Sequence, residues 1–97
     1  MEVNKQLGFL KEQTQNIDSE ILILIKRRLQ TQKRIFEAQI KNKLDVSTSE
    51  NDIETIDYVT KKAREMEISD SFIHKLYSTI LDETDEMKKE YVKKQKK

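Results

Sequence analysis

The chain has 97 residues, of which 19 are basic and 18 acidic, with no cysteine, no proline and a single glycine. At roughly 150 residues per domain, this length predicts one domain over residues 1–97. The tight turns of β-rich proteins depend on glycine and proline, so the composition excludes most β folds and predicts an all-α protein. The missing cysteines exclude disulfides and cysteine-based metal or redox sites. A net charge of +1 argues against a nucleic-acid partner.

The apolar content is low for a compact domain, since 35% of the residues are hydrophobic and 38% are charged, against a usual charged share of about 25%. A chain of this length buries only about two-thirds of its unfolded surface when it folds alone. It is therefore either disordered or completes its core with a partner. The N-terminus lacks an apolar signal region, and the longest apolar run, residues 21–25, is much shorter than the roughly 18 residues of a membrane span. We expect a soluble cytoplasmic protein without a membrane partner.

The first predicted helix covers residues 2 to about 43, where nothing in the sequence stops a helix. At about 1.5 Å per residue it forms a rod about 60 Å long, roughly twice the diameter of a small domain. The rest of the chain is too short to cover such a rod, whereas a second copy packed alongside can cover it. We therefore expect an intertwined homodimer. The seam is an apolar stripe at helical spacing, called here the heptad stripe: Val3, Leu7, Leu10, Ile17, Ile21, Leu24, Ile35 and Ala38.

The first helix is expected to end where residues 44–49 lose the apolar periodicity. Ser47 followed by Glu50 fits a capping box, in which the two side chains satisfy backbone amides at a helix start. A second helix is predicted from about residue 50 to 66.

A second break follows at residues 68–70, where Ser69 or Asp70 can cap a new helix. The third helix is predicted over residues 70–92. The basic residues at 93–97 are expected to form a solvated tail, because charged chain ends commonly fray.

Arg28 interrupts the heptad stripe between Leu24 and Ile35. Burying a guanidinium without a partner is costly, so Arg28 must face a carboxylate or an anionic ligand. One interpretation is a structural salt bridge to Asp18 or Glu20, or an arginine that extends its charged end to solvent. The other is a ligand site.

Further polar residues fall on inward or nearly inward positions. Thr84 and Lys88 follow one another on the inner side of the third helix, and Gln39 lies beside the heptad stripe. Together with Arg28, these side chains are more typical of a pocket for an anion than of a core. His74 has no second His or Cys at ligand spacing, so we expect neither a metal site nor a cofactor.

Residues 17–28, with the sequence IDSEILILIKRR, resemble the first-helix signature of the all-α chorismate mutases of the AroQ type. That signature is an Ile/Leu-Asp pair, an apolar stretch and a closing arginine. The resemblance extends from about residue 7 to 91 and includes both predicted helix breaks. It implies an interlocked dimer of three-helix chains and a role in aromatic amino acid biosynthesis.

The resemblance also implies a reaction, the Claisen rearrangement of chorismate to prephenate. This pericyclic step needs no nucleophile, metal or general base. The protein holds the compact diaxial conformer of the substrate and places donors on the ether oxygen, where negative charge grows. Cationic side chains clamp the two substrate carboxylates, a task suited to arginine.

The positions that the resemblance assigns to catalysis are Arg28, Gln39 and Lys88. Arg28 agrees with the carboxylate-binding arginine of the family. Gln39 replaces the family's lysine at the ether oxygen, and Lys88 stands where many members have the glutamine that contacts the same oxygen. We hypothesise that the lysine and the glutamine have exchanged helices, because the electrostatic requirement is indifferent to which helix supplies the charge.

The resemblance assigns substrate binding to Lys11, Thr48, Asp52 and Thr84. Lys11 replaces an arginine that reaches into the partner's site. Asp52 replaces the glutamate that binds the ring hydroxyl, and Thr84 keeps the hydroxyl of a serine. Thr48 and Asn51 replace an aspartate and an arginine of the family pattern.

Two alternatives stay open at this point. The same fold can act on a related substrate, isochorismate or 4-amino-4-deoxychorismate, because the changed residues at 48, 51 and 52 lie where the family recognises ring substituents. The chain can also be a non-catalytic dimeric binding or regulatory module, which the loss of charge at positions 39, 48 and 51 favours.

Overall fold

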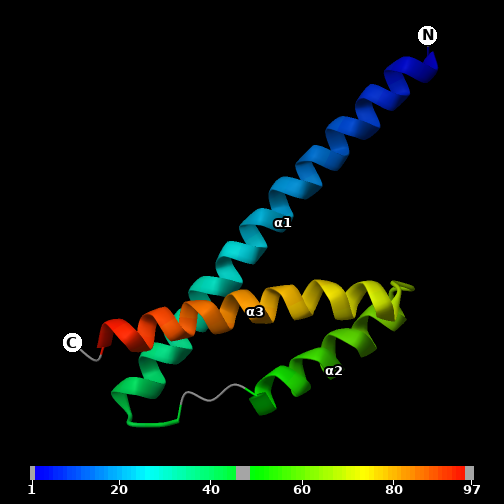
Figure 1. Ribbon diagram of the computed structural model, residues 1–97. Helices are drawn as coiled ribbons and strands as arrows, with labels where there is room; N and C mark the ends of the chain where they lie inside the picture. Colours follow the sequence, from blue (N-terminus) through cyan, green and yellow to red (C-terminus); the bar gives the residue numbers. More distant parts are fainter. Residues whose placement is uncertain (1, 46–48, 96–97) are drawn as a thin grey trace. The chain divides into compact units, whose positions relative to one another are not determined.

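The computed structural model describes residues 2–45 and 49–95, with the side chains of residues 2–45 and 52–94. Three helices follow one another along the chain: α1 over Glu2–Lys41, α2 over Ser49–Glu65 and α3 over Asp70–Gln95 (Figure 1). No strand occurs in these two ranges. The predicted all-α class is therefore confirmed, and the three helices lie where the sequence placed them. α3 continues further than expected, through the exposed Lys93 and Lys94, whose charges favour a helix C-terminus.

α1 ends in a hydrogen-bonded cap that uses no glycine. Lys43 takes the left-handed conformation, with φ of 57°. The Leu44 amide donates to the Gln39 carbonyl at 2.7 Å, and the Lys43 amide donates to Ile40 at 3.1 Å. This pairing is the Schellman motif, in which an apolar residue usually follows the left-handed one, as Leu44 does here.

α2 ends in the same motif. Glu67 has φ of 60°, the Ile68 amide donates to the Ala63 carbonyl at 2.8 Å, and the Glu67 amide donates to Arg64 at 3.1 Å. The left-handed backbone conformation costs a residue other than glycine roughly 1–2 kcal/mol. The chain has this cost at the C-terminal ends of both α1 and α2, which therefore end without a glycine.

The turn between α2 and α3 is closed by side chains on both sides. Ser69 Oγ accepts the Phe72 amide at 3.4 Å, so Ser69 is the N-cap that the sequence predicted as one of two candidates. Asp70 instead accepts hydrogen bonds from Arg64 Nε and Nη2, the shortest at 2.8 Å. The capping box expected from Ser47 and Glu50 lies outside the described side chains. α2 and α3 thus form an antiparallel helical hairpin (Figure 1).

The chain divides into two compact units, Met1–Gln32 and Lys33–Lys97. The first unit is the N-terminal part of α1, and every described side chain from residue 2 to 27 is exposed. The second unit comprises the end of α1 with the α2–α3 hairpin. It holds all buried side chains of the described part: Phe36, Thr60, Ala63, Ile73, Leu81 and Thr84.

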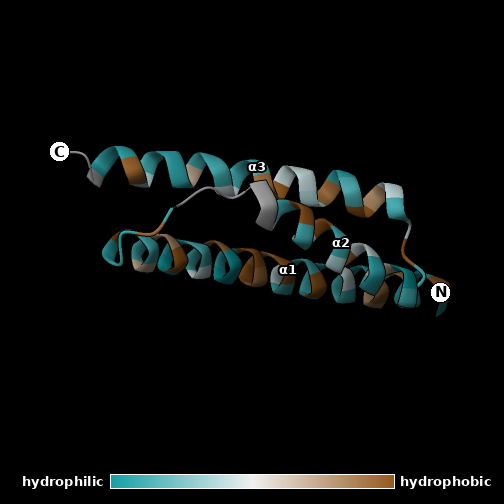
Figure 2. Cartoon of the chain, turned by 90° about the horizontal axis from the view of Figure 1, so that it is seen from below, coloured by the Kyte–Doolittle hydropathy of each residue, from teal (hydrophilic) through white to brown (hydrophobic). Residues whose placement is uncertain are grey.

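The end of α1 buries a different face from the heptad stripe. Phe36 is only 1% exposed, whereas its stripe neighbour Ile35 is 41% exposed. Gln39 and Ile40 are half-buried on the same side as Phe36, and Ala38 is exposed. Apolar segments therefore occur around α1 and along its length, alternating with polar ones (Figure 2).

In the described residues, no helix combines the length and apolar character needed to cross a membrane.

Candidate active site

Two of the candidate residues lie one turn apart on the inward side of α3. Thr84 is 4% exposed, and its hydroxyl donates to the Ile80 carbonyl at 3.0 Å. The Lys88 side chain is 17% exposed, with Nζ 3.9 Å from Asp85 Oδ1. Such low exposure is unusual for a lysine, because lysine side chains are rarely buried.

Gln39 contributes a buried amide from the end of α1. Its Oε1 is inaccessible to solvent and has no hydrogen-bond partner among the described residues. An unsatisfied buried acceptor costs about 1–3 kcal/mol. A ligand that supplies an N–H or O–H group removes this cost, and the same carboxamide rotated by half a turn presents two donors instead.

Asp52 lies near the start of α2 and is half-buried. It stands about as far in sequence from the turn at residues 66–69 as Thr84 does on the other arm. Antiparallel packing of the two helices therefore puts Asp52 near the level of Thr84, with Lys88 one turn further along α3. The side chain of Asn51 and the whole of Thr48 lie outside the described part of the chain.

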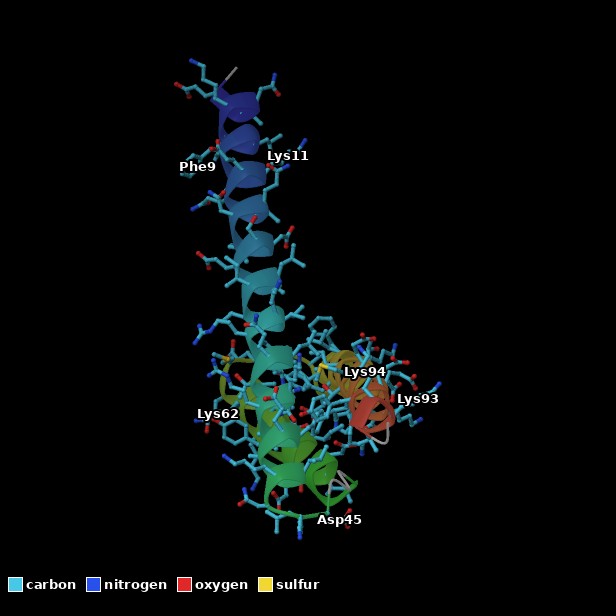
Figure 3. The ribbon with its side chains drawn as sticks, turned by 90° about the vertical axis from the view of Figure 1, so that its left-hand side faces the viewer. Phe9, Lys11, Asp45, Lys62, Lys93 and Lys94 are labelled. Atoms are coloured by element: carbon cyan, nitrogen blue, oxygen red, sulfur yellow. The ribbon has the colours of Figure 1, made fainter. Side chains whose placement is uncertain are left out.

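The remaining two candidates belong to the other compact unit. Arg28 is half-buried, whereas its neighbour Arg27 is exposed. Lys11 is exposed and projects from the N-terminal half of α1, opposite Phe9 in this view (Figure 3). Of the seven predicted site residues, Gln39, Asp52, Thr84 and Lys88 therefore fall in the unit Lys33–Lys97.

Sequence reasoning missed one charged group beside the site. Asp85 follows Thr84 directly and forms the ion pair with Lys88. Its side chain is 35% exposed. The signal that could have found it is the spacing, because residues three apart on a helix are neighbours.

A second missed feature is Thr60 on α2, which is 8% exposed and whose hydroxyl has no partner in the described part of the chain. Four other helical threonines donate their hydroxyl to the carbonyl four residues earlier: Thr14, Thr31, Thr79 and Thr84. Thr60 is thus a polar group in the core of the hairpin that nothing in the described residues satisfies.

The perturbed titrations lie at the turn between α2 and α3. The hydrogen bond from Arg64 lowers the pKa of the Asp70 carboxyl, and the same contact raises the pKa of Arg64. Both side chains are exposed, at 65% and 45%. This pair fastens the turn of the hairpin and lies at the opposite end of the hairpin from Asp52.

A scan against protein-family models finds a match to the family described as chorismate mutase type II, over residues 10–89. The matched range covers most of the chain and contains every candidate site residue from Lys11 to Lys88. Neither the curated proteins nor the solved structures gave a match.

Proposed function

Because the chain belongs to the chorismate mutase type II family, we propose that it rearranges chorismate to prephenate. The observation that carries this proposal is the family match over all three helices, within which Thr84, Lys88 and Gln39 are withdrawn from water on one compact unit. Removing a lysine and an amide from water costs free energy. Binding of an anionic substrate to these two groups offsets that cost.

The active form in this proposal is a homodimer. Along the N-terminal unit the heptad stripe is uncovered, with Ile17 54%, Ile21 47% and Leu24 57% exposed. Full burial of such a side chain contributes about 1.5–3 kcal/mol, so a second copy packed on the stripe is stabilised by several of these contributions. The exposed Lys11 then serves the site of the partner subunit.

Catalysis in this proposal is conformational and electrostatic. Arg28 and Lys11 bind the two carboxylates of the substrate and hold it in the diaxial conformer, in which the reacting carbons are close together. The entropy cost of reaching this conformer is then met on binding and not in the chemical step. Asp52 accepts the ring hydroxyl. Thr84, one turn before Lys88, completes the wall of the site on α3.

The ether oxygen is served by Lys88 and Gln39. As the C–O bond breaks, negative charge grows on this oxygen, and a prepositioned cation with an amide N–H stabilises it best where water is excluded. The low exposure of the Lys88 side chain and the buried oxygen end of the Gln39 carboxamide, which presents N–H donors when it is rotated by half a turn, support this assignment. The cation then comes from α3 and the amide from α1, the reverse of the arrangement that the family resemblance implies.

A related substrate is the second candidate. The half-buried Asp52, which the family resemblance assigns to the ring substituent, also suits a substrate with an N–H donor at that position, as in 4-amino-4-deoxychorismate. Comparing turnover of chorismate, isochorismate and the amino compound separates these substrates.

The direct test is to incubate the purified protein with chorismate and follow the loss of its diene absorbance. We expect a rate above the uncatalysed background that scales with protein concentration, from a species that light scattering identifies as a dimer. The Arg28→Ala variant, prepared identically, should lose this rate because it lacks the arginine that binds a substrate carboxylate. A rate that came from a contaminating mutase would be the same in both preparations. A folded dimer that turns over none of the three substrates would contradict the proposed function and favour a binding module.

A further inference from the structure

We infer that Asp85 is a positioning residue that fixes the ammonium group of Lys88 for the reaction. This inference rests on the proposed function, since it concerns the cation assigned to the ether oxygen. The observation behind it is the ion pair between Asp85 Oδ1 and Lys88 Nζ at 3.9 Å, formed on the inward side of α3 next to the buried Thr84.

A neighbouring pair on the same helix shows what is special about this contact. Lys89 and Glu86 have the same three-residue spacing, with Nζ 3.6 Å from Oε1, but their side chains are 71% and 69% exposed. The side chains of Lys88 and Asp85 are 17% and 35% exposed. Exposed pairs of this kind contribute little and are screened by salt. The withdrawn pair experiences less screening, so its attraction holds the two groups together more strongly.

Asp85 holds the Lys88 ammonium through charge and not through a hydrogen bond. A lysine has a flexible four-carbon stem and three rotatable donors, and its head needs an additional contact to be held at one place. A separation of 3.9 Å is an ion pair and is too long for a hydrogen bond. Through this contact Asp85 attracts the ammonium without accepting a hydrogen bond from it.

The Asp85 carboxylate also has an opposing effect on the reaction, so the sign of the rate change on its removal tests the inference. A negative charge beside Lys88 reduces the positive potential at the ether oxygen. If this were the main effect, removing the charge of Asp85 would accelerate the reaction. If positioning is the main effect, removal slows the reaction, because a displacement of about 1 Å can cost on the order of 100-fold in rate.

The experiment compares Asp85→Asn, Asp85→Glu and the matched control Glu86→Gln in the full-length chain with chorismate. We expect Asp85→Asn to lower kcat by about 10-fold to 100-fold with KM changed by no more than about threefold, since the group acts on the transition state through Lys88. Asp85→Glu, which keeps the charge, should recover most of the loss. Glu86→Gln should match the wild type. An unchanged or raised kcat in Asp85→Asn, or an equal loss in Glu86→Gln, would overturn the inference.

A readout without substrate separates this inference from the proposed function. Lysine acylation at limiting reagent, quantified by mass spectrometry, gives the ratio of modification at Lys88 to that at the exposed Lys61. The ratio should rise at least about threefold in Asp85→Asn, because Lys88 loses a contact of low exposure, and it should stay constant in Glu86→Gln. If the wild type is inactive, the proposed function fails, and the ratio alone decides on Asp85: a rise supports the contact, and a constant ratio overturns it.

Discussion

The N-terminal unit Met1–Gln32 and the unit Lys33–Lys97 use their apolar side chains in opposite ways. In the first, the large apolar residues from Val3 to Ile25 are all between 37% and 67% exposed. In the second, Phe36, Ile73 and Leu81 are at most 7% exposed. The first unit therefore has an apolar surface without a core, and the second has a small core of its own. Burial of an apolar face normally stabilises a helix, and the described side chains 2–27 of the first unit are all exposed.

α1 takes part in both units because it carries two apolar faces. The heptad stripe runs along its whole length, and a second face near its C-terminal end carries Phe36 and Ile40, with the Gln39 amide beside them. An apolar stripe on a helix typically faces another element, and the heptad stripe of the N-terminal unit is exposed. We therefore expect a partner on the N-terminal unit, and substitutions in each of the two units can test this expectation.

The largest effect is expected where the exposed stripe is broken. Leu24→Lys places an ammonium in the proposed dimer seam, where burial of an unpaired charge is strongly unfavourable. We expect the variant to sediment as a monomer, to lose helical circular dichroism and to lose all mutase activity. Lys26→Ala, at an exposed position outside the stripe, is the control. A dimeric and active Leu24→Lys protein would show that the stripe is not the seam.

The next effect concerns the half-buried arginine of the same unit. Arg28→Ala should lower kcat/KM by about 10³-fold, because removing one partner of a desolvated charge pair costs about 3–5 kcal/mol. Arg27→Ala removes the same charge from an exposed neighbouring position and should change kcat/KM by less than about twofold. Equal effects of the two variants would mean that Arg28 acts only through the net charge of the chain.

A smaller loss is expected in the second unit. Lys88→Gln should reduce kcat by about 100-fold, the scale of losing one transition-state donor, while Lys89→Gln leaves it unchanged. The double variant Gln39→Lys with Lys88→Gln restores a cation on α1 and an amide on α3, and it should recover activity relative to Lys88→Gln. A double variant no more active than the single one would contradict the exchange of the two roles between helices.

The helices were predictable because their signals are local. Periodicity and the absence of proline gave α1, and residue type alone gave Ser69 as one of two cap candidates. The two helix ends at Lys43 and Glu67 were placed by the loss of periodicity, although their left-handed conformation has no sequence signal when glycine is absent. Local patterns thus located every element that the structure describes.

The burial pattern was less predictable, because it depends on which face meets which neighbour. The heptad count put Ile35 in the seam and did not single out Phe36, yet Phe36 is the most buried side chain in the described residues. Similarly, the inward positions of Thr84 and Lys88 followed from spacing, whereas the withdrawal of Asp85 with Lys88 required coordinates. The roles of all seven predicted site residues, Lys11, Thr48 and Asp52 among them, stay predictions.

A stabilising change is expected in the core of the second unit. Thr60→Val replaces a buried hydroxyl that has no partner in the described residues with a methyl group of similar size. Relief of an unsatisfied buried group should stabilise the fold by about 1 kcal/mol and raise Tm by about 4–8 °C for a chain of this size. Thr79→Val is the control, since Thr79 is exposed and its hydroxyl donates to the Lys75 carbonyl. A lower Tm for Thr60→Val would indicate that the hydroxyl is satisfied in solution.

The smallest effect concerns the turn of the hairpin and is visible only through pH. The hydrogen bond from Arg64 lowers the pKa of Asp70 from its ordinary value near 3.8. A carboxyl with a lowered folded-state pKa contributes stability that is present above its unfolded-state pKa and is lost as pH falls through the folded value. Asp70→Asn should therefore be less stable than the wild type at neutral pH.

The difference between these two proteins should shrink as pH falls below about 3.8. Arg64 stays protonated over this whole range and adds no pH dependence of its own. Urea unfolding of both proteins at several pH values measures the difference directly, and high salt should reduce it because the pair is exposed. A difference that is constant with pH would mean that Asp70 acts on the hairpin through its position at the start of α3 and not through its charge.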